Sequence, residues 1–142
     1  MRLAFVKAAL VDAESGESIQ RVKVPDIEIP ILSKEIGWAE QDPELWWEYL
    51  CKATKFLLNK ANIKSEDISS IGISYQMHGL VIVDQNLKPL RNSIIWCDSR
   101  ATSYGQEAFE KLGQSYCREH LLNSPGNFTA SKLAWVINNE SQ

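Results

Sequence analysis

The chain has 142 residues, a mass of 16.1 kDa, 44% hydrophobic and 23% charged residues, and a formal net charge of −3. These values are typical of one globular domain and argue against a disordered, collagen-like or low-complexity protein. The negative charge disfavours a nucleic acid as the main partner, and no apolar run approaches the ~20 residues of a membrane span. We expect neither nucleic acid nor membrane as a partner.

Cysteine usage and the first residues indicate the cellular compartment. Cys51, Cys97 and Cys117 are odd in number and widely spaced, which matches neither a disulfide framework nor a zinc pattern of paired cysteines. The N-terminus lacks the long apolar core and cleavage site of a signal peptide. Reduced thiols and a cytoplasmic location are therefore expected.

The first elements are predicted to form a hairpin followed by a helix. Residues 5–12 and 18–24 have the composition and alternation of strands, and residues 14–17 between them supply a turn. After an irregular stretch over 25–41, Asp42 suits the cap of a helix and Pro43 its first position. Apolar residues then recur at helical spacing, which predicts a helix from about Pro43 to about Asn62.

Strands alternate with helices in the remainder of the chain. Arg100 to Leu112 is predicted to be a helix that ends at Gly113, and Thr129 is predicted to cap the last helix. Strands are expected over 67–75, 79–84 and 93–96, and a short helix over 115–122. The expected class is an α/β domain with a mixed sheet.

The segment from Ile73 to Leu80 is the first candidate for chemistry. It runs from a β-branched strand into Gln76, Met77 and His78, and ligands of open α/β sheets lie beyond strand ends. The polar groups suit the hydroxyls of a small polyol, and the methionine suits its C–H faces. Alternatively, His78 is a hydrogen-bonded turn residue and Met77 a core residue.

The segment from Ile94 to Arg100 is the second candidate, with an apolar strand that ends in Trp96. An indole face can stack on the apolar side of a sugar, and the carboxylate of Asp98 can accept hydrogen bonds from its hydroxyls. Alternatively, Trp96 is a core residue, and Asp98 pairs with Arg100 to fix the turn from strand to helix.

Two other kinds of site fit the pattern less well. Cys97, His78 and Asp98 have the residue types of a nucleophilic set, but neighbouring residues on a strand point to opposite faces. His78, Asp98 and His120 lack a recurrent metal-ligand spacing. Neither of the two glycine-rich nucleotide-binding motifs, G-x-x-x-x-G-K-[ST] and G-x-G-x-x-G, occurs in the sequence.

Four segments, in order, resemble the N-terminal domain of the FGGY family of carbohydrate kinases. The Gln76–Gly79 run is most similar to the xylulokinases of that family, and residues 126–136 resemble its first signature region. The resemblance extends from about Val6 onward. The segments are Gly37–Trp47, Ile71–Leu80, Leu90–Arg100 and Gly126–Val136.

The resemblance implies a ribonuclease H-like (actin-like ATPase) fold and the transfer of a phosphoryl group from ATP, with Mg²⁺, to a sugar hydroxyl. It implies that Met77 and His78 contact the sugar, and that Trp96 and Asp98 lie near the same cleft. Glycerol-specific relatives carry an Arg-Glu pair in place of Met77-His78. The expected substrate is therefore a ketopentose, with D-xylulose first.

The departures from the family pattern concern the nucleotide side. Residues 1–5 stand where the family has an acidic residue and a small-residue phosphate loop, so the first strand is expected to be truncated. The family's catalytic Asp, its adenosine pocket and its C-terminal domain would lie beyond Gln142. The expected domain is thus an incomplete FGGY N-terminal domain over 1–142, with no catalytic, cofactor-binding or metal residue of its own, and inactive alone.

Three functions remain open at this point. The chain supplies the sugar-binding side of a xylulokinase-type enzyme; or it binds a sugar weakly without turnover; or it is an inactive remnant whose exposed sheet edges favour self-association. The chain is then expected to be a natural fragment, the product of a misassigned start, or an isolated domain.

Overall fold

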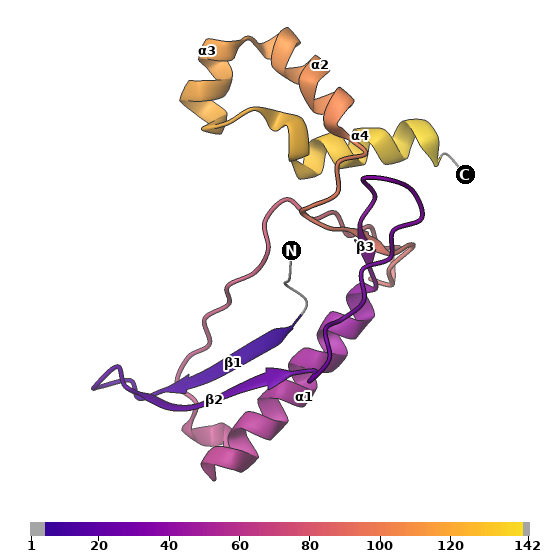
Figure 1. The fold of residues 1–142 in the computed structure, drawn as a ribbon. Helices are drawn as coiled ribbons and strands as arrows, with labels where there is room; N and C mark the ends of the chain where they lie inside the picture. Colours follow the sequence, from indigo (N-terminus) through magenta and orange to yellow (C-terminus); the bar gives the residue numbers. More distant parts are fainter. Residues whose placement is uncertain (1–4, 141–142) are drawn as a thin grey trace. The chain divides into compact units, whose positions relative to one another are not determined.

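The computed structural model describes residues 5–140, which fall into two compact units (Figure 1). Unit 1 contains the described part of Met1–Pro30 together with Asp42–Tyr75, and unit 2 contains Ile31–Gln41 and the described residues from Gln76 onward. Most of the segment expected in place of a phosphate loop, residues 1–4, lies outside the described residues. Within these, no helix combines the length and apolar character needed to cross a membrane.

Unit 1 opens with the predicted hairpin, formed by β1 (Val6–Val11) and β2 (Ser18–Val24). The strands pair antiparallel from Val6 opposite Val24 to Leu10 opposite Gln20, followed by a bulge. In the turn, the carboxylate of Asp12 accepts hydrogen bonds from the backbone N–H and the hydroxyl of Ser15, both at 2.8 Å. These bonds stabilise the ionised carboxylate and lower the pKa of Asp12.

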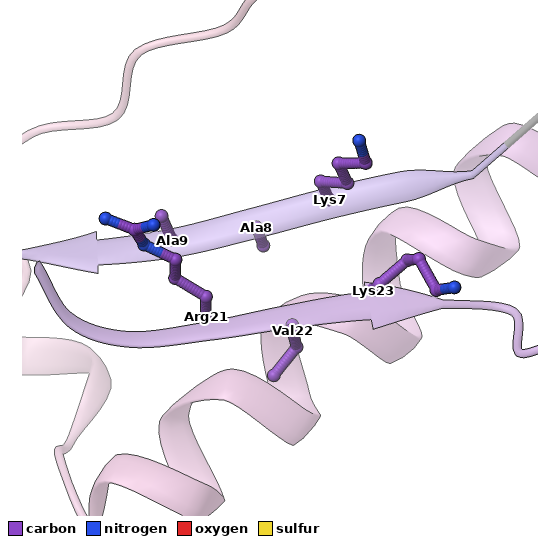
Figure 2. Close-up of a pocket in the computed structure, with 6 residues that line it drawn as sticks. All are labelled: Lys7, Ala8, Ala9, Arg21, Val22 and Lys23. Carbon is purple, nitrogen blue, oxygen red and sulfur yellow. The ribbon is translucent and has the colours of Figure 1, made fainter. Parts of the chain in front are cut away.

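The two faces of the hairpin differ, as the alternation predicts. Inward residues of both strands pack with Ala53 and Leu57 of the following helix, α1 (Pro43–Ala61), around the buried Val22, which Figure 2 shows pointing toward that helix. The opposite face carries Lys7, Arg21 and Lys23, three cations that border a hollow of about 320 Å³. The inward set also includes Val6, Ala8, Leu10 and Val24.

Helix α1 (Pro43–Ala61) confirms the predicted bounds to within one residue. The Asp42 side chain accepts a hydrogen bond from the Glu44 N–H at 2.9 Å, and Pro43 occupies the first helical position. Asn62 ends the helix with a left-handed φ of 52°. Local capping chemistry therefore sets both ends.

The predicted strand over 67–75 is wrong. A single 3₁₀ turn, η1 (Ser65–Asp67), precedes an extended segment that pairs with no strand in the described part of the chain. Ile71, Ile73 and Tyr75 are 82%, 77% and 79% exposed. The alternation is that of a strand, but a ladder also requires a neighbouring edge, which periodicity does not supply.

Unit 2 contains a second small sheet, in which β3 (Glu40–Gln41) pairs antiparallel with β4 (Ser93–Ile94). Leu32 extends it beyond Glu40, and Leu80 extends it beyond Ile94, each by one isolated bridge. The expected strand over 79–84 thus provides only bridges, and the strand over 93–96 is shorter than predicted. All ladders over residues 5–140 are antiparallel, so one continuous mixed sheet is not seen there.

The helices of unit 2 are α2 (Thr102–Leu112), α3 (Gln114–Tyr116) and α4 (Thr129–Asn139). Helix α2 ends at Gly113 as predicted but begins two residues later than expected, while the short helix expected over 115–122 is divided between α3 and the π turn η2 (Cys117–Leu121). Thr129 does not cap α4. It is the first helical residue, and its hydroxyl donates to the Gly79 carbonyl at 3.2 Å.

One close approach joins α2 to the 3₁₀ turn η3 (Pro125–Asn127). A Cβ atom on Gly105 would lie 2.3 Å from the Gly126 Cα and 2.6 Å from the Pro125 carbonyl oxygen. Only glycine fits at this crossing, because both obstructing atoms belong to the backbone. The start of α4 is thereby placed close to α2.

Candidate functional site

The Met77–His78 turn is the most accessible part of the candidate site. His78 has a left-handed φ of 63°, and the Met77 side chain is 66% exposed. The His78 ring stacks on the Phe128 ring, with centroids 4.8 Å apart and planes 6° from parallel. The imidazole therefore has a fixed orientation, while the neighbouring thioether is open to solvent.

Lys132 of α4 contacts the backbone of this turn. Its ammonium group donates to the His78 carbonyl oxygen at 2.6 Å and to the Asn127 carbonyl oxygen at 3.2 Å, and the residue is 0% exposed. Burial lowers the pKa of Lys132, and the nearby Asp98 and Cys97 partly oppose this effect. The sequence indicated Lys132 only as a member of the last helix.

Trp96 reaches the same place through its backbone. Its carbonyl oxygen accepts a hydrogen bond from the Asn127 side-chain amide, and Asn127 in turn accepts from Lys132. The indole is partly buried. Asn127 and Lys132 therefore join the segments of His78 and Trp96, the two segments that sequence reasoning selected.

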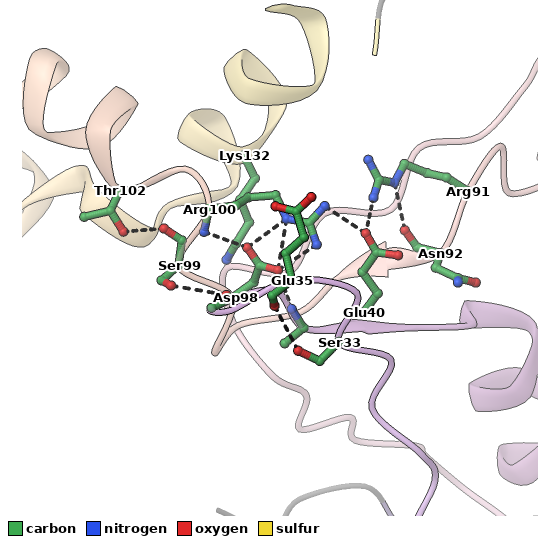
Figure 3. Close-up of polar contacts among 12 residues, drawn as sticks. Ser33, Glu35, Glu40, Arg91, Asn92, Asp98, Ser99, Arg100, Thr102 and Lys132 are labelled. Carbon is green, nitrogen blue, oxygen red and sulfur yellow. Dashed lines mark hydrogen bonds and ion pairs between the residues drawn. The ribbon is translucent and has the colours of Figure 1, made fainter. Parts of the chain in front are cut away.

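Asp98 is buried, with 1% exposure, and its carboxylate is occupied by protein donors (Figure 3). It accepts from the Ala39 N–H at 2.5 Å and from the Arg100 N–H at 2.9 Å. The Arg100 guanidinium adds Nε at 3.0 Å and Nη2 at 2.8 Å. This geometry supports the structural alternative for Asp98, and contact with a sugar stays a prediction.

Arg100 is the centre of a larger ionic network in unit 2. Its guanidinium carbon lies 3.8 Å from the Trp38 ring centroid and 5.0 Å from that of Trp135, and Nη1 lies 2.8 Å from a Glu40 carboxylate oxygen. Arg91 pairs with the same Glu40 (Figure 3). Arg91 also pairs with Glu140, which follows α4. The network holds the loop around Trp38, the Asp98 turn and α4 together.

The alternative sites are placed as follows. Cys97 is exposed whereas Asp98 is buried, so the two neighbouring side chains lie in different environments. His120 contacts the Tyr116 ring, with centroids 4.4 Å apart. Among residues 5–140, no three or more His, Cys, Asp or Glu side chains gather in a way that could hold a metal ion.

Comparison with known proteins identifies the class to which this fold and site belong. The sequence model of the N-terminal domain of the FGGY family of carbohydrate kinases matches residues 4–142. The chain belongs to this family, as its motifs predicted.

Individual relatives include xylulose kinases and glycerol kinases. The chain is 36% identical over 118 residues to the xylulose kinase of Bacillus subtilis (strain 168), which covers 80% of this chain and 23% of that protein. It is 29% identical over 133 residues to the glycerol kinase of Thermococcus gammatolerans, covering 94% of this chain and 26% of that protein. The chain thus spans about a quarter of these relatives.

Solved structures confirm the expected fold class. The crystal structure titled a xyloylose kinase from Brucella ovis matches with a TM-score of 0.83 and 32% identity, over 97% of this chain and 28% of that one. The ligand-bound xylulose kinase from Lactobacillus acidophilus matches with a TM-score of 0.75 and 26% identity, over 95% of this chain and 26% of that one. The described residues therefore have the N-terminal architecture of the actin-like ATPase fold.

Proposed function

We propose that this chain forms the sugar-binding side of the cleft in an ATP-dependent sugar kinase that phosphorylates D-xylulose. The observation that carries the proposal is the Met77–His78 turn, which presents an exposed thioether beside an imidazole fixed by Phe128. The xylulose kinases among the relatives favour a ketopentose over glycerol as the substrate.

Each proposed residue has a chemical task. The imidazole of His78 exchanges hydrogen bonds with sugar hydroxyls, because each ring nitrogen is a donor or an acceptor. Met77 packs its thioether on the C–H faces of the sugar, and Trp96 lines the same side. Asp98 is the fourth proposed residue; its described contacts fix the Trp96–Arg100 turn beside the sugar.

ATP and Mg²⁺ complete the proposed reaction from outside the described residues. The bound nucleotide would supply the phosphoryl group, and phosphoryl transfer depends on positioning and on charge neutralisation around it. Because the chain spans about a quarter of its relatives, we assign sugar binding to this chain and phosphate activation to a C-terminal kinase domain, and we expect no turnover from the 142 residues alone.

A fusion tests the proposed activity. Residues 6–142 replace the matching part of the B. subtilis xylulose kinase, which keeps its own residues ahead of that part, and ATP consumption is measured with D-xylulose, D-ribulose and glycerol. D-Xylulose is expected to give the highest kcat/KM. Glycerol as the best substrate would overturn the sugar assignment.

The two histidines of the chain offer a matched pair of variants in this fusion. His78→Gln is expected to lower kcat/KM for D-xylulose about tenfold, the usual effect of one lost substrate hydrogen bond. His120→Gln changes an exposed ring on η2 and is expected to leave it unchanged. Equal activity of both variants would remove His78 from the site, provided that circular dichroism shows both to be folded.

The exposed apolar segment favours a second candidate, an inactive remnant. Ile71, Ile73 and Tyr75 leave a large apolar surface open to water, which is typical of an interaction surface or of an aggregation-prone segment. Sedimentation velocity of the 142-residue chain distinguishes the candidates. Irreversible aggregation together with an inactive fusion would support the remnant, and a monomer that responds to D-xylulose would exclude it.

A further inference from the structure

We propose that Lys132 is a positioning residue of the sugar site, whose ammonium group holds His78 in its left-handed conformation and thereby aims Met77 and His78 at the sugar. The inference rests on the proposed function, which it deepens. Lys132 itself contacts protein carbonyl groups and is completely buried.

Two residues at the start of α4 contact His78. Lys132 binds the His78 carbonyl oxygen at 2.6 Å, and Phe128, four residues earlier at the N-cap of α4, stacks on the His78 ring at 4.8 Å. Residues four apart lie on the same face of a helix. One helix end therefore fixes both the backbone and the side chain of His78.

The left-handed conformation of His78 explains why it needs the contacts from Lys132 and Phe128. A residue with a Cβ atom adopts it only at a cost in free energy, because the Cβ approaches a backbone carbonyl oxygen. His78 has this conformation at φ 63° between the exposed Met77 and the bridge residue Leu80. Without an external donor, the peptide after His78 would be free to rotate and carry the imidazole away from Phe128.

A charged amine suits this position better than other donors. The ammonium group is compact and carries three N–H donors, of which two are directed at the carbonyl oxygens of His78 and Asn127. Asp98 supplies nearby negative charge that partly offsets the burial of the cation. The guanidinium group of an arginine is planar and larger, so it would suit this space, which is lined by backbone carbonyl groups, less well than the compact ammonium group.

The wild-type chain tests the contact directly. In a ¹⁵N,¹³C-labelled sample of the 142-residue chain, the Lys132 ammonium group is expected to exchange slowly with water. It should also show scalar coupling through the hydrogen bond to the His78 carbonyl carbon. An ammonium group that exchanges as fast as those of surface lysines, without this coupling, would overturn the inference.

The small number of methionines and histidines simplifies the NMR spectra of a second test, which compares variants. The chain has two methionines and two histidines, so ¹³C-methyl-methionine and labelled histidine report on Met77 and His78 with one further signal of each type. Lys132→Met is compared with Lys111→Met, which removes an exposed amine paired with Glu107 on α2. Lys132→Met is expected to abolish the ring-to-ring nuclear Overhauser contact of His78 with Phe128, and Lys111→Met to preserve it.

Titration with D-xylulose separates the two proposals. In the wild type, the sugar is expected to shift the Met77 methyl and His78 ring signals, and Lys132→Met should weaken this response about tenfold or more. A wild type without any sugar response would overturn the proposed function. A Lys132→Met variant that keeps the ring contact and the wild-type titration would overturn this inference alone. Should that variant not fold, the coupling in the wild type still decides.

Discussion

Different interactions stabilise the interior of each of the two units of this chain. Unit 1 packs a hairpin on one helix through small and branched apolar residues around Val22, Ala53 and Leu57. Unit 2 has a buried ionic network at its centre, with Asp98, Arg100 and Glu40 all nearly inaccessible to water. Apolar packing thus joins the hairpin to its helix in unit 1, whereas charged side chains join segments that are distant in sequence in unit 2.

The largest effect is expected from breaking the network. Asp98→Ala leaves the Arg100 guanidinium without its bidentate partner and the Ala39 N–H without an acceptor. Loss of one partner of a buried ion pair costs about 3–5 kcal/mol. Hydrogen exchange should accelerate over residues 76–140, with little change in unit 1.

The matched control is Glu107→Gln, which breaks an exposed ion pair with Lys111 on α2. Exposed pairs contribute about 0–1 kcal/mol, so exchange should stay near the wild-type rate. Equal acceleration in both units by Asp98→Ala would contradict the distinction drawn between them.

The apolar unit should respond to a cavity. Leu57→Ala removes a buried side chain from α1 that packs under the hairpin, at an expected cost of about 2–5 kcal/mol. Urea unfolding of unit 1, followed by amide signals of β1 and β2, measures it. Phe56→Ala, at a neighbouring position that is 52% exposed, is the control and should cost less than about 1 kcal/mol. A similar cost for both variants would show that the inner face is not the core.

A smaller effect is expected at the crossing of α2 and η3. Gly105→Ala places a Cβ against backbone atoms of Pro125 and Gly126, and overpacking of this kind costs about 1–3 kcal/mol. The gain in helix propensity from alanine, about 1 kcal/mol, opposes only part of it. Thermal unfolding compares it with Gly72→Ala, where nothing lies within 4 Å. An increased Tm for Gly105→Ala would show that the crossing is looser than described.

The smallest effect concerns pH. Burial lowers the pKa of Lys132 in the folded state, so the unfolded chain binds more protons between that pKa and the ordinary lysine value of 10.5. The stability contributed at this position therefore rises as the pH increases through that window. As the pH rises from neutral to alkaline, the unfolding free energy of the wild type should increase relative to that of Lys132→Met. A shift in the opposite direction would contradict burial as the dominant influence.

Local chemistry made unit 1 largely predictable. Asp42 and Pro43 announce the start of α1, and the alternation over 18–24 gives the inner face of β2. The extended residues over 67–75 were the exception, because strand periodicity says nothing about whether a neighbouring edge is present. The motif resemblance indicated the family, whereas the two candidate segments followed from polar and aromatic residues at the ends of predicted strands.

Unit 2 was less predictable because its important contacts are long-range. The bond from Ala39 to Asp98 spans 59 residues, and that from Lys132 to His78 spans 54. Neither residue pair has a local pattern that marks it. The alternatives stated for Asp98 nevertheless included its pairing with Arg100, which the structure contains. Lys132 was missed because a lysine in an amphipathic helix ordinarily faces solvent.

The extended residues before the candidate site have a consequence for any work with the isolated chain. From Ile68 to Met77 the sequence carries no Asp, Glu, Lys or Arg, and it combines branched and aromatic side chains with a backbone that joins no ladder among residues 5–140. Such stretches add readily to the strands of identical molecules and grow into cross-β stacks. A single gatekeeper charge, such as Ile73→Lys, should raise the concentration at which samples stay clear, because it leaves the Lys132 anchor intact while making the stacked form electrostatically unfavourable.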